Sequence, residues 1–224
     1  TGAGIASSAS GFAALAVGLN KLFDLALKEE EVSKIARLGS GSACRSVPDG
    51  FVEWIPGNDH SDSFARSITP SDHWSLADCI VVVETEHKQT GSTEGHTLAN
   101  TSVVQKCRIE DTPRRLDICR SAILERDFAS LAAIAEQDSD LMHAVMMTST
   151  PPLHYWTTAT ISIIQKVKSL RAEGMACFYT IDAGSNVHVI TLESQSQELT
   201  HLLKQMHGVQ QVIVSGVGNG AFAE

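Results

Sequence analysis

The sequence predicts an α+β protein in which helices and strands follow one another along most of the chain. Apolar residues recur at helical spacing in long segments, and between them they gather in short runs typical of strands. Hydrophobic residues make up 43% and charged residues 19% of the 224 residues, as in an ordinary globular protein. No apolar run approaches the ~20 residues that a membrane-spanning helix needs. We therefore expect a soluble protein without a membrane partner, built as one large or two small domains.

The helices are predicted from apolar spacing and from the residues at their ends. They cover residues 4–24, 29–38, 93–100, 111–126, 127–147, 157–173 and 196–206. Pro113 stands near the start of the fourth of these, where its fixed φ and missing N–H are tolerated. In the first helix, large apolar residues lie on one side. Strands are expected at residues 51–55, 79–83, 175–181, 187–192 and 209–214, with a further one at 63–68.

The chain begins with a small-residue stretch, TGAGIASSASGF, that leads directly into the first predicted helix. The first turn of a helix has unpaired N–H groups and a partial positive charge, so a phosphate can bind there. Ser7 and Ser8 add hydroxyl groups that could reach a phosphate or a phosphate-bound Mg²⁺. The stretch has no Gly-Lys-Ser/Thr and no preceding strand, so it matches neither a Walker A loop nor a dinucleotide fingerprint. The alternative is a Gly/Ser-rich helix cap without a ligand.

Two further segments carry groups suited to anion binding or catalysis. Residues 39–46, GSGSACRS, combine hydroxyl groups with the guanidinium of Arg45, whose planar fork suits a carboxylate or phosphate. Asp182 follows an apolar strand and precedes a turn. A carboxylate there could act as a base or orient a hydroxyl group. The alternative for Asp182 is a turn-forming residue that caps its own backbone.

Composition disfavours several other classes of function. The balance of 17 basic to 26 acidic residues, a formal net charge of −9, argues against a nucleic-acid partner. The cysteines are scattered without a C-x-x-C pair, which favours reduced thiols in the cytoplasm and argues against zinc. The histidines show no paired-ligand spacing, so His143 and His154 are expected to be buried or interfacial polar residues rather than metal ligands.

Together these segments resemble the mevalonate diphosphate decarboxylases of the GHMP small-molecule kinase superfamily. The opening stretch is similar to that family's phosphate loop, with mild departures at Gly2 and Ile5. Residues 39–46 match its Gly-Ser-Gly-Ser-Ala-Cys-Arg-Ser motif at every position. Residues 180–186, TIDAGSN, match its Thr-Ile-Asp-Ala-Gly-Pro-Asn motif except at Ser185. Similarity continues through GSTEG at 91–95, MHA at 142–144 and GVGNG at 216–220.

The resemblance implies a GHMP-kinase-like fold of two domains. The first, residues 1–84, would be a truncated N-terminal ribosomal-protein-S5-like α/β part. The second, residues 85–224, would be a C-terminal domain with ferredoxin-like helices on an antiparallel sheet. Ligands would bind in a cleft between the two domains. Family members have several strands before the phosphate loop, so we expect the chain to be a fragment of a longer enzyme.

The resemblance also implies a reaction. This is the ATP- and Mg²⁺-dependent decarboxylation of mevalonate 5-diphosphate to isopentenyl diphosphate in isoprenoid biosynthesis, in the cytoplasm. Asp182 would orient or deprotonate the substrate hydroxyl group, and Arg45 would bind the substrate carboxylate or a neighbouring phosphate. Further binding roles follow for small residues: Ser40, Ser42 and Ser92 toward the substrate, and Gly4, Ala6, Ser7 and Ser8 toward the ATP phosphates. Ser8 is also the candidate for contact with Mg²⁺.

Several alternatives remain open within this resemblance. His96 stands where many family members that use the diphosphate have Met, and some relatives use mevalonate 5-phosphate and form isopentenyl phosphate. Other relatives only phosphorylate mevalonate. A catalytically inactive fragment that acts as a binding module is a further alternative. A sugar or homoserine kinase is disfavoured by the unbroken motif at residues 39–46. The sequence does not reveal the oligomeric state, for which a homodimer is the common default.

Overall fold

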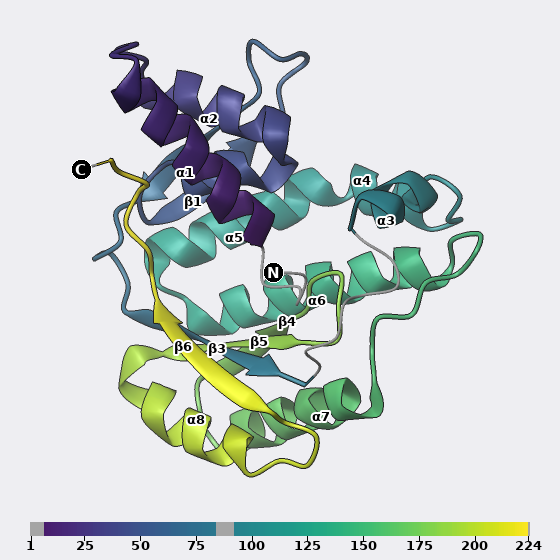
Figure 1. Cartoon of the computed structure of the whole chain (residues 1–224). Helices are drawn as coiled ribbons and strands as arrows, with labels where there is room; N and C mark the ends of the chain where they lie inside the picture. Colours follow the sequence, from purple (N-terminus) through teal and green to yellow (C-terminus); the bar gives the residue numbers. More distant parts are fainter. Residues whose placement is uncertain (1–6, 84–91, 224) are drawn as a thin grey trace. The chain divides into compact units, whose positions relative to one another are not determined.

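A computed structural model describes residues 7–83 and 92–223, which form two compact units (Figure 1). The first unit contains residues 7–75 and 217–223, and the second contains residues 76–83 and 92–216. The predicted domain division at residues 84 and 85 falls at the edge of residues 84–91, which lie outside this description. The limits of the domains therefore stay a prediction, while strand β3 (Leu76–Val82) pairs within the second unit.

The first unit combines two helices, a short 3-10 helix and a β-hairpin. Its elements are α1 (Ser7–Leu22), α2 (Glu29–Gly39), η1 (Gly41–Ser46), β1 (Phe51–Ile55) and β2 (Phe64–Thr69). Strands β1 and β2 pair antiparallel, and η1 packs against both helices. Helix α2 begins with three glutamates, whose charge is favourable at a helix N-terminus.

Helix α1 buries small residues rather than large ones. Ala13 is 1% exposed and Ala16 is 7% exposed, and both belong to a core shared with α2 and η1. The large apolar residues that sequence spacing places on one side of this helix are instead exposed: Phe12, Leu15, Leu19, Leu22 and Phe23. Alanine faces allow close approach of the backbones, so in this unit the core forms on the small-residue side of α1.

The end of the chain returns to the first unit, where its glycines make close backbone contacts. The N–H of Gly50 donates to the carbonyl of Gly218 at 3.1 Å, and the N–H of Ala221 donates to the carbonyl of Val47 at 3.0 Å. A Cβ at Gly220 would lie 3.0 Å from that same carbonyl oxygen of Val47. The backbone approach therefore explains the glycine there, and the segment GVGNG acts structurally in closing this unit.

The second unit is built on a four-stranded antiparallel sheet. Strand β3 pairs with β5 (Val187–Leu192) on one side and with β6 (Gln211–Gly216) on the other. Strand β4 (Cys177–Thr180) pairs with β5 at the edge, which gives the order β4-β5-β3-β6. Six helices accompany it: α3 (Ser92–Ala99), α4 (Gln105–Glu110), α5 (Thr112–Glu125), α6 (Phe128–Met147), α7 (Thr158–Ala172) and α8 (Ser196–Lys204). A 3-10 turn, η2 (Glu193–Gln195), leads into α8.

Helices cover both faces of this sheet (Figure 1). Helices α7 and α8 pack on one face of the sheet. On that face Val81, Val187 and Val189 are fully buried in a core shared with the two helices. On the other face, Phe128 of α6 contacts Phe178 of β4, with ring centroids 5.4 Å apart. Alternation along the strands thus divides the apolar side chains between two layers of helices.

The predicted α+β class is confirmed, with helices on an antiparallel sheet as the resemblance implied. Most predicted elements occur within a few residues of their expected ends. Two elements were not predicted. Helix α4 is short and contains no buried residue, and η1 is a 3-10 helix without an apolar period. Among the described residues, no helix has the length and apolar character required to cross a membrane.

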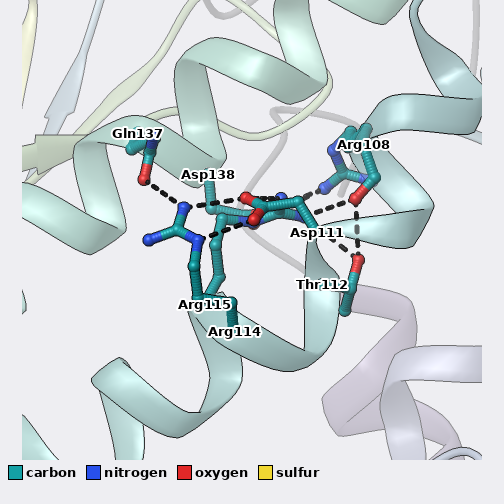
Figure 2. A network of polar contacts seen from close by, with 7 residues as sticks. All are labelled: Arg108, Asp111, Thr112, Arg114, Arg115, Gln137 and Asp138. Atoms are coloured by element: carbon teal, nitrogen blue, oxygen red, sulfur yellow. Dashed lines mark hydrogen bonds and ion pairs between the residues drawn. The ribbon is translucent and has the colours of Figure 1, made fainter.

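A buried arginine joins three helices of the second unit (Figure 2). The Arg115 side chain is 4% exposed and donates to the Asp111 carboxylate at 2.9 Å and to the Asp138 carboxylate at 3.0 Å. It also donates to the carbonyl of Arg108 at 3.0 Å. The more exposed Arg114 binds the same Asp111, and its hydrogen bonds hold the pKa of that carboxyl down to about 2. Arg115 therefore connects α4, α5 and α6 from inside the fold.

We predict that Arg115→Ala destabilises the protein by about 2–3 kcal/mol, because it removes a buried donor and leaves two carboxylates without it. This estimate lies below the usual cost of breaking a buried pair, since the Asp111 and Asp138 side chains are 34% and 49% exposed. Urea unfolding measures the change. Arg114→Ala is the matched control and should cause a much smaller loss. Equal losses would contradict a special role for the buried guanidinium.

Candidate functional site

The first unit brings two of the predicted anion-binding segments together. The Ser8 hydroxyl group, in the first turn of α1, lies 3.2 Å from the Ser40 hydroxyl group. That turn contains no acidic residue, so the partial positive charge of the helix N-terminus is not neutralised there. The preceding residue, Gly39, makes room for the Phe12 ring, which a Cβ at that position would overlap. Two hydroxyl groups and a helix N-terminus therefore lie close together.

The interior residues of the GSGSACRS motif are packing residues. Ala43 and Cys44 are fully buried, and burial raises the pKa of the Cys44 thiol although Arg45 is adjacent. The Ser33 hydroxyl group of α2 donates to the carbonyl of Cys44 at 3.1 Å and accepts from the N–H of Ala65 at 2.9 Å. The motif is thus held between α2 and β2, and Cys44 does not have the character of a nucleophile.

The remaining motif residues are directed out of the core. Arg45 is exposed and Ser42 is half-buried. Within the described part of the chain, no hydrogen bond or ion pair engages the Arg45 guanidinium, which is unlike the paired Arg37, Arg108 and Arg171. A rigid scaffold that presents an unpaired guanidinium beside hydroxyl groups is suited to binding an anionic ligand.

Asp182 lies in the second unit, two residues after the end of β4. It is exposed, and its carbonyl accepts from the N–H of Gly184 at 2.7 Å in a tight turn. No hydrogen-bond donor engages its carboxylate among residues 7–83 and 92–223. The turn is therefore made by backbone groups, and the Asp182 carboxylate is left available for another partner.

Side chains that sequence reasoning did not select hold the segment around Asp182. The Thr160 hydroxyl group of α7 donates to the carbonyl of Ser185 at 2.7 Å, and the Asn186 side chain accepts from the N–H of Val83 at 2.8 Å. His143 of α6, only 2% exposed, contacts the carbonyl of Ile181. Burial lowers the pKa of His143 to about 4, against the favourable effect of that contact. The expectation that His143 is a buried polar residue is confirmed.

The structure describes only some of the predicted site residues, and their roles stay predictions. Ser8, Ser40, Ser42 and Arg45 lie in the first unit, and Asp182 lies in the second. Gly4, Ala6 and the side chains of Ser7 and Ser92 lie outside the described part of the chain; Ser7 and Ser92 are the first residues of α1 and α3. In the residues that are described, no group of three or more His, Cys, Asp or Glu side chains could hold a metal ion.

The fold defines a GHMP-kinase-like chain, in which a predicted anion-binding segment lies at a helix N-terminus. Comparison with known families agrees with this class. The model of the mevalonate 5-diphosphate decarboxylase C-terminal domain matches residues 79–220, and that of the diphosphomevalonate decarboxylase-like N-terminal domain matches residues 1–65. The chain belongs to the mevalonate 5-diphosphate decarboxylase family.

Individual relatives support the same assignment. The diphosphomevalonate decarboxylase of Candida albicans is 40% identical over 213 residues, which are 93% of this chain and 59% of that protein. The mevalonate diphosphate decarboxylase structure from Staphylococcus aureus is 34% identical, with a TM-score of 0.89, over 97% of this chain and 67% of that one. A structure described as MDDEF in complex with MVAPP, AMPPCP and magnesium is 33% identical, with a TM-score of 0.91, over 98% and 68% of the two chains.

The chain thus spans between half and three fifths of the length of curated relatives such as those of Candida albicans and Rattus norvegicus. The family and the fold are shown over the matched residues, and activity belongs to the complete protein.

We predict that His143 makes the stability of the fold depend on pH between about 6.5 and about 4. The unfolded imidazole binds a proton below its ordinary pKa, whereas the buried imidazole does so only near pH 4. The free energy of unfolding is therefore highest above pH 6.5. It decreases as the pH falls and the unfolded chain binds the proton, by up to about 3 kcal/mol. Urea unfolding of wild type and His143→Gln at several pH values measures this. Parallel pH profiles of the two proteins would refute it.

Proposed function

We propose that this chain carries active-site residues of an ATP-dependent decarboxylase acting on mevalonate 5-diphosphate, a phosphorylated 3-hydroxy acid. The observation that carries the proposal is the unpaired, outward position of two groups within motifs of the family, the Arg45 guanidinium and the Asp182 carboxylate. Each is presented by a segment that buried hydrogen bonds hold in place, through Ser33 in one unit and through Thr160 in the other. A related structure described with MVAPP, AMPPCP and magnesium supports the choice of ligands.

The phosphates of ATP are assigned to the first unit. Hydroxyl groups of Ser8 and Ser40, 3.2 Å apart, fit phosphate oxygens, and the acid-free first turn of α1 favours negative charge. Gly4, Ala6 and Ser7 belong to the same proposed loop, and Ser8 is the proposed contact with Mg²⁺. When bound, Mg²⁺ would neutralise phosphate charge. The absence of a carboxylate from this turn fits an ion that the phosphates hold.

The organic substrate is assigned to polar groups of the family motifs. The Arg45 fork would bind its carboxylate or a neighbouring phosphate, with hydroxyl groups of Ser40, Ser42 and Ser92 as further donors. Asp182 would accept a hydrogen bond from the tertiary hydroxyl group, which orients or deprotonates it.

The proposed reaction has two steps. The substrate hydroxyl oxygen forms a bond to the γ-phosphorus as the bond to ADP breaks, and the hydroxyl proton passes to Asp182 or to solvent. The C–O bond then breaks with loss of phosphate, while the electron pair of the breaking C–C bond forms the alkene as CO₂ leaves. The products are isopentenyl diphosphate, ADP, phosphate and CO₂.

Related features of the protein are also proposals. The described cysteines are all free, which fits the reduced thiols of a cytoplasmic enzyme. A homodimer and the absence of nucleic-acid partners remain expectations from the sequence. Mevalonate 5-phosphate is the alternative substrate, because the residues that match the family motifs do not distinguish the two phosphate tails.

The first experiment incubates the complete gene product with ATP, Mg²⁺ and either mevalonate 5-diphosphate or mevalonate 5-phosphate, and measures ADP and CO₂ together. We expect equal amounts of both products, with faster turnover of the diphosphate. Faster turnover of the monophosphate would change the substrate assigned. ADP without CO₂ would identify a kinase, and neither product would contradict the proposed activity.

We predict that Asp182→Asn lowers kcat by about 10²–10⁴-fold, because an amide keeps the shape of the side chain but cannot accept a proton or bear the charge. The KM for ATP should stay within about twofold if the ATP phosphates bind elsewhere. Asp117→Asn, on the exposed surface of the same unit, is the control and should retain wild-type turnover. Normal kcat in Asp182→Asn would remove this residue from the mechanism.

We predict that Arg45→Lys lowers kcat/KM for the phosphorylated substrate by about tenfold or more, since an ammonium group cannot reproduce a bidentate fork. Steady-state kinetics measure the loss. Arg66→Lys, at an exposed position of β2 in the same unit, should leave kcat/KM unchanged. An equally small effect of both substitutions would show that a point charge is sufficient at Arg45.

A further inference from the structure

The backbone of Ile181 is held by helix side chains instead of by a neighbouring strand. The ladder between β4 and β5 ends with the pair Thr180 and His188. At the next residue, the N–H of Ile181 donates to the Ser139 hydroxyl group at 3.0 Å. The Ile181 carbonyl lies 3.1 Å from Nε2 of His143. Both polar groups of this buried residue are therefore satisfied by α6, which packs against β4 (Figure 1).

The spacing of the two helix residues suits this role. Ser139 and His143 are four positions apart, so they lie on one face of α6, one turn from each other. Both are buried, at 5% and 2% exposure. Ser139 accepts from the N–H of Ile181 and donates to its carbonyl at 3.5 Å. His143 contacts the same carbonyl, so together the two side chains form a two-point clamp on a single residue. We call Ser139 and His143 the α6 clamp.

The hydrogen bond fixes the protonation of His143. A carbonyl oxygen only accepts, so Nε2 must carry the proton. The His143 ring also packs against two aromatic rings. Its centroid lies 5.0 Å from that of Trp156 and 5.9 Å from that of Tyr155. Burial keeps the pKa of His143 near 4, so near neutral pH a single tautomer serves as donor to Ile181.

The segment after Asp182 is also anchored by side-chain hydrogen bonds. The hydroxyl group of Thr160, which is fully buried, donates to the carbonyl of Ser185 at 2.7 Å. The next residue, Asn186, accepts from the N–H of Val83. Only residues 182–184 lie between these anchors and the α6 clamp, so the position of the Asp182 backbone depends on both ends of a short span.

We propose that Ser139 and His143 are positioning residues for Asp182, which act through the Ile181 backbone without touching substrate. This inference rests on the proposed function of Asp182. The clamp places the peptide that precedes the carboxylate, and misplacement by about 1 Å in such a site can cost about 10²-fold in rate. Neither residue type signals this role in the sequence, because the partner is a backbone group 38 or more residues away.

The test separates positioning from general stability with variants of α6. His143→Leu removes the donor, His143→Gln keeps an amide donor, and Ser139→Ala removes the acceptor with little change in volume. Val145→Ala is the matched control: Val145 is 1% exposed but belongs to a separate core cluster, so it lowers stability without touching Ile181. Amide hydrogen exchange at residues 181–186 and steady-state kinetics are measured on the complete gene product.

We expect His143→Leu and Ser139→Ala to speed exchange of these amides by about tenfold or more relative to Val145→Ala, and to lower kcat by about 10–100-fold with the KM for ATP unchanged. His143→Gln should recover most of both losses. Exchange equal to that of Val145→Ala, or faster exchange with normal kcat, would overturn the proposal. If the wild type released no CO₂, the proposed function would fail, and the exchange data alone would still decide whether the clamp holds the segment.

Discussion

Pairing of strand β3 on both sides is the constraint on which the second unit depends. Its ladders with β5 and β6 fix the middle of the sheet, and the N–H of Val83 at its end binds the Asn186 side chain. Because β5 in turn pairs with β4, the segment carrying Asp182 lies between two strands whose register is set from the centre. The buried valines of β3 and β5 then pack against α7 and α8, so the same residues stabilise the sheet and the helices on this face.

The first unit depends on a different feature, the close approach of backbone segments that carry small side chains. Alanine on α1 lets this helix pack closely on α2 and η1, and the glycine at position 39 leaves room for the Phe12 ring. In this arrangement the hydroxyl groups of Ser8 and Ser40 lie 3.2 Å apart. The short side chains of the GSGSACRS motif thus serve packing at Ala43 and Cys44 and ligand contact at the proposed outward positions.

Periodicity predicted most helices and strands because α6, α7 and the strands bury regular apolar faces. It does not identify the buried side of α1, because alanine is a weak apolar signal beside Phe12 and Leu15. The short helix α4 escaped because it buries no residue. Motif likeness located Arg45 and Asp182, whose roles remain proposals. Ser139 and Thr160 were not found, and Asn186 was noted only as a motif residue without a role, since the partners of all three are distant backbone atoms.

The chain enters and leaves the second unit at one place. Ala77, near the start of β3, pairs with Gly216 at the end of β6, so residues 76–216 form an insertion whose two ends are adjacent. Adjacent ends of this kind allow a unit to be inserted into another chain as a whole domain. It also means that the first unit is assembled from residues distant in sequence. During synthesis on the ribosome, the contacts that residues 217–223 make with this unit can form only after residues 76–216 have been made.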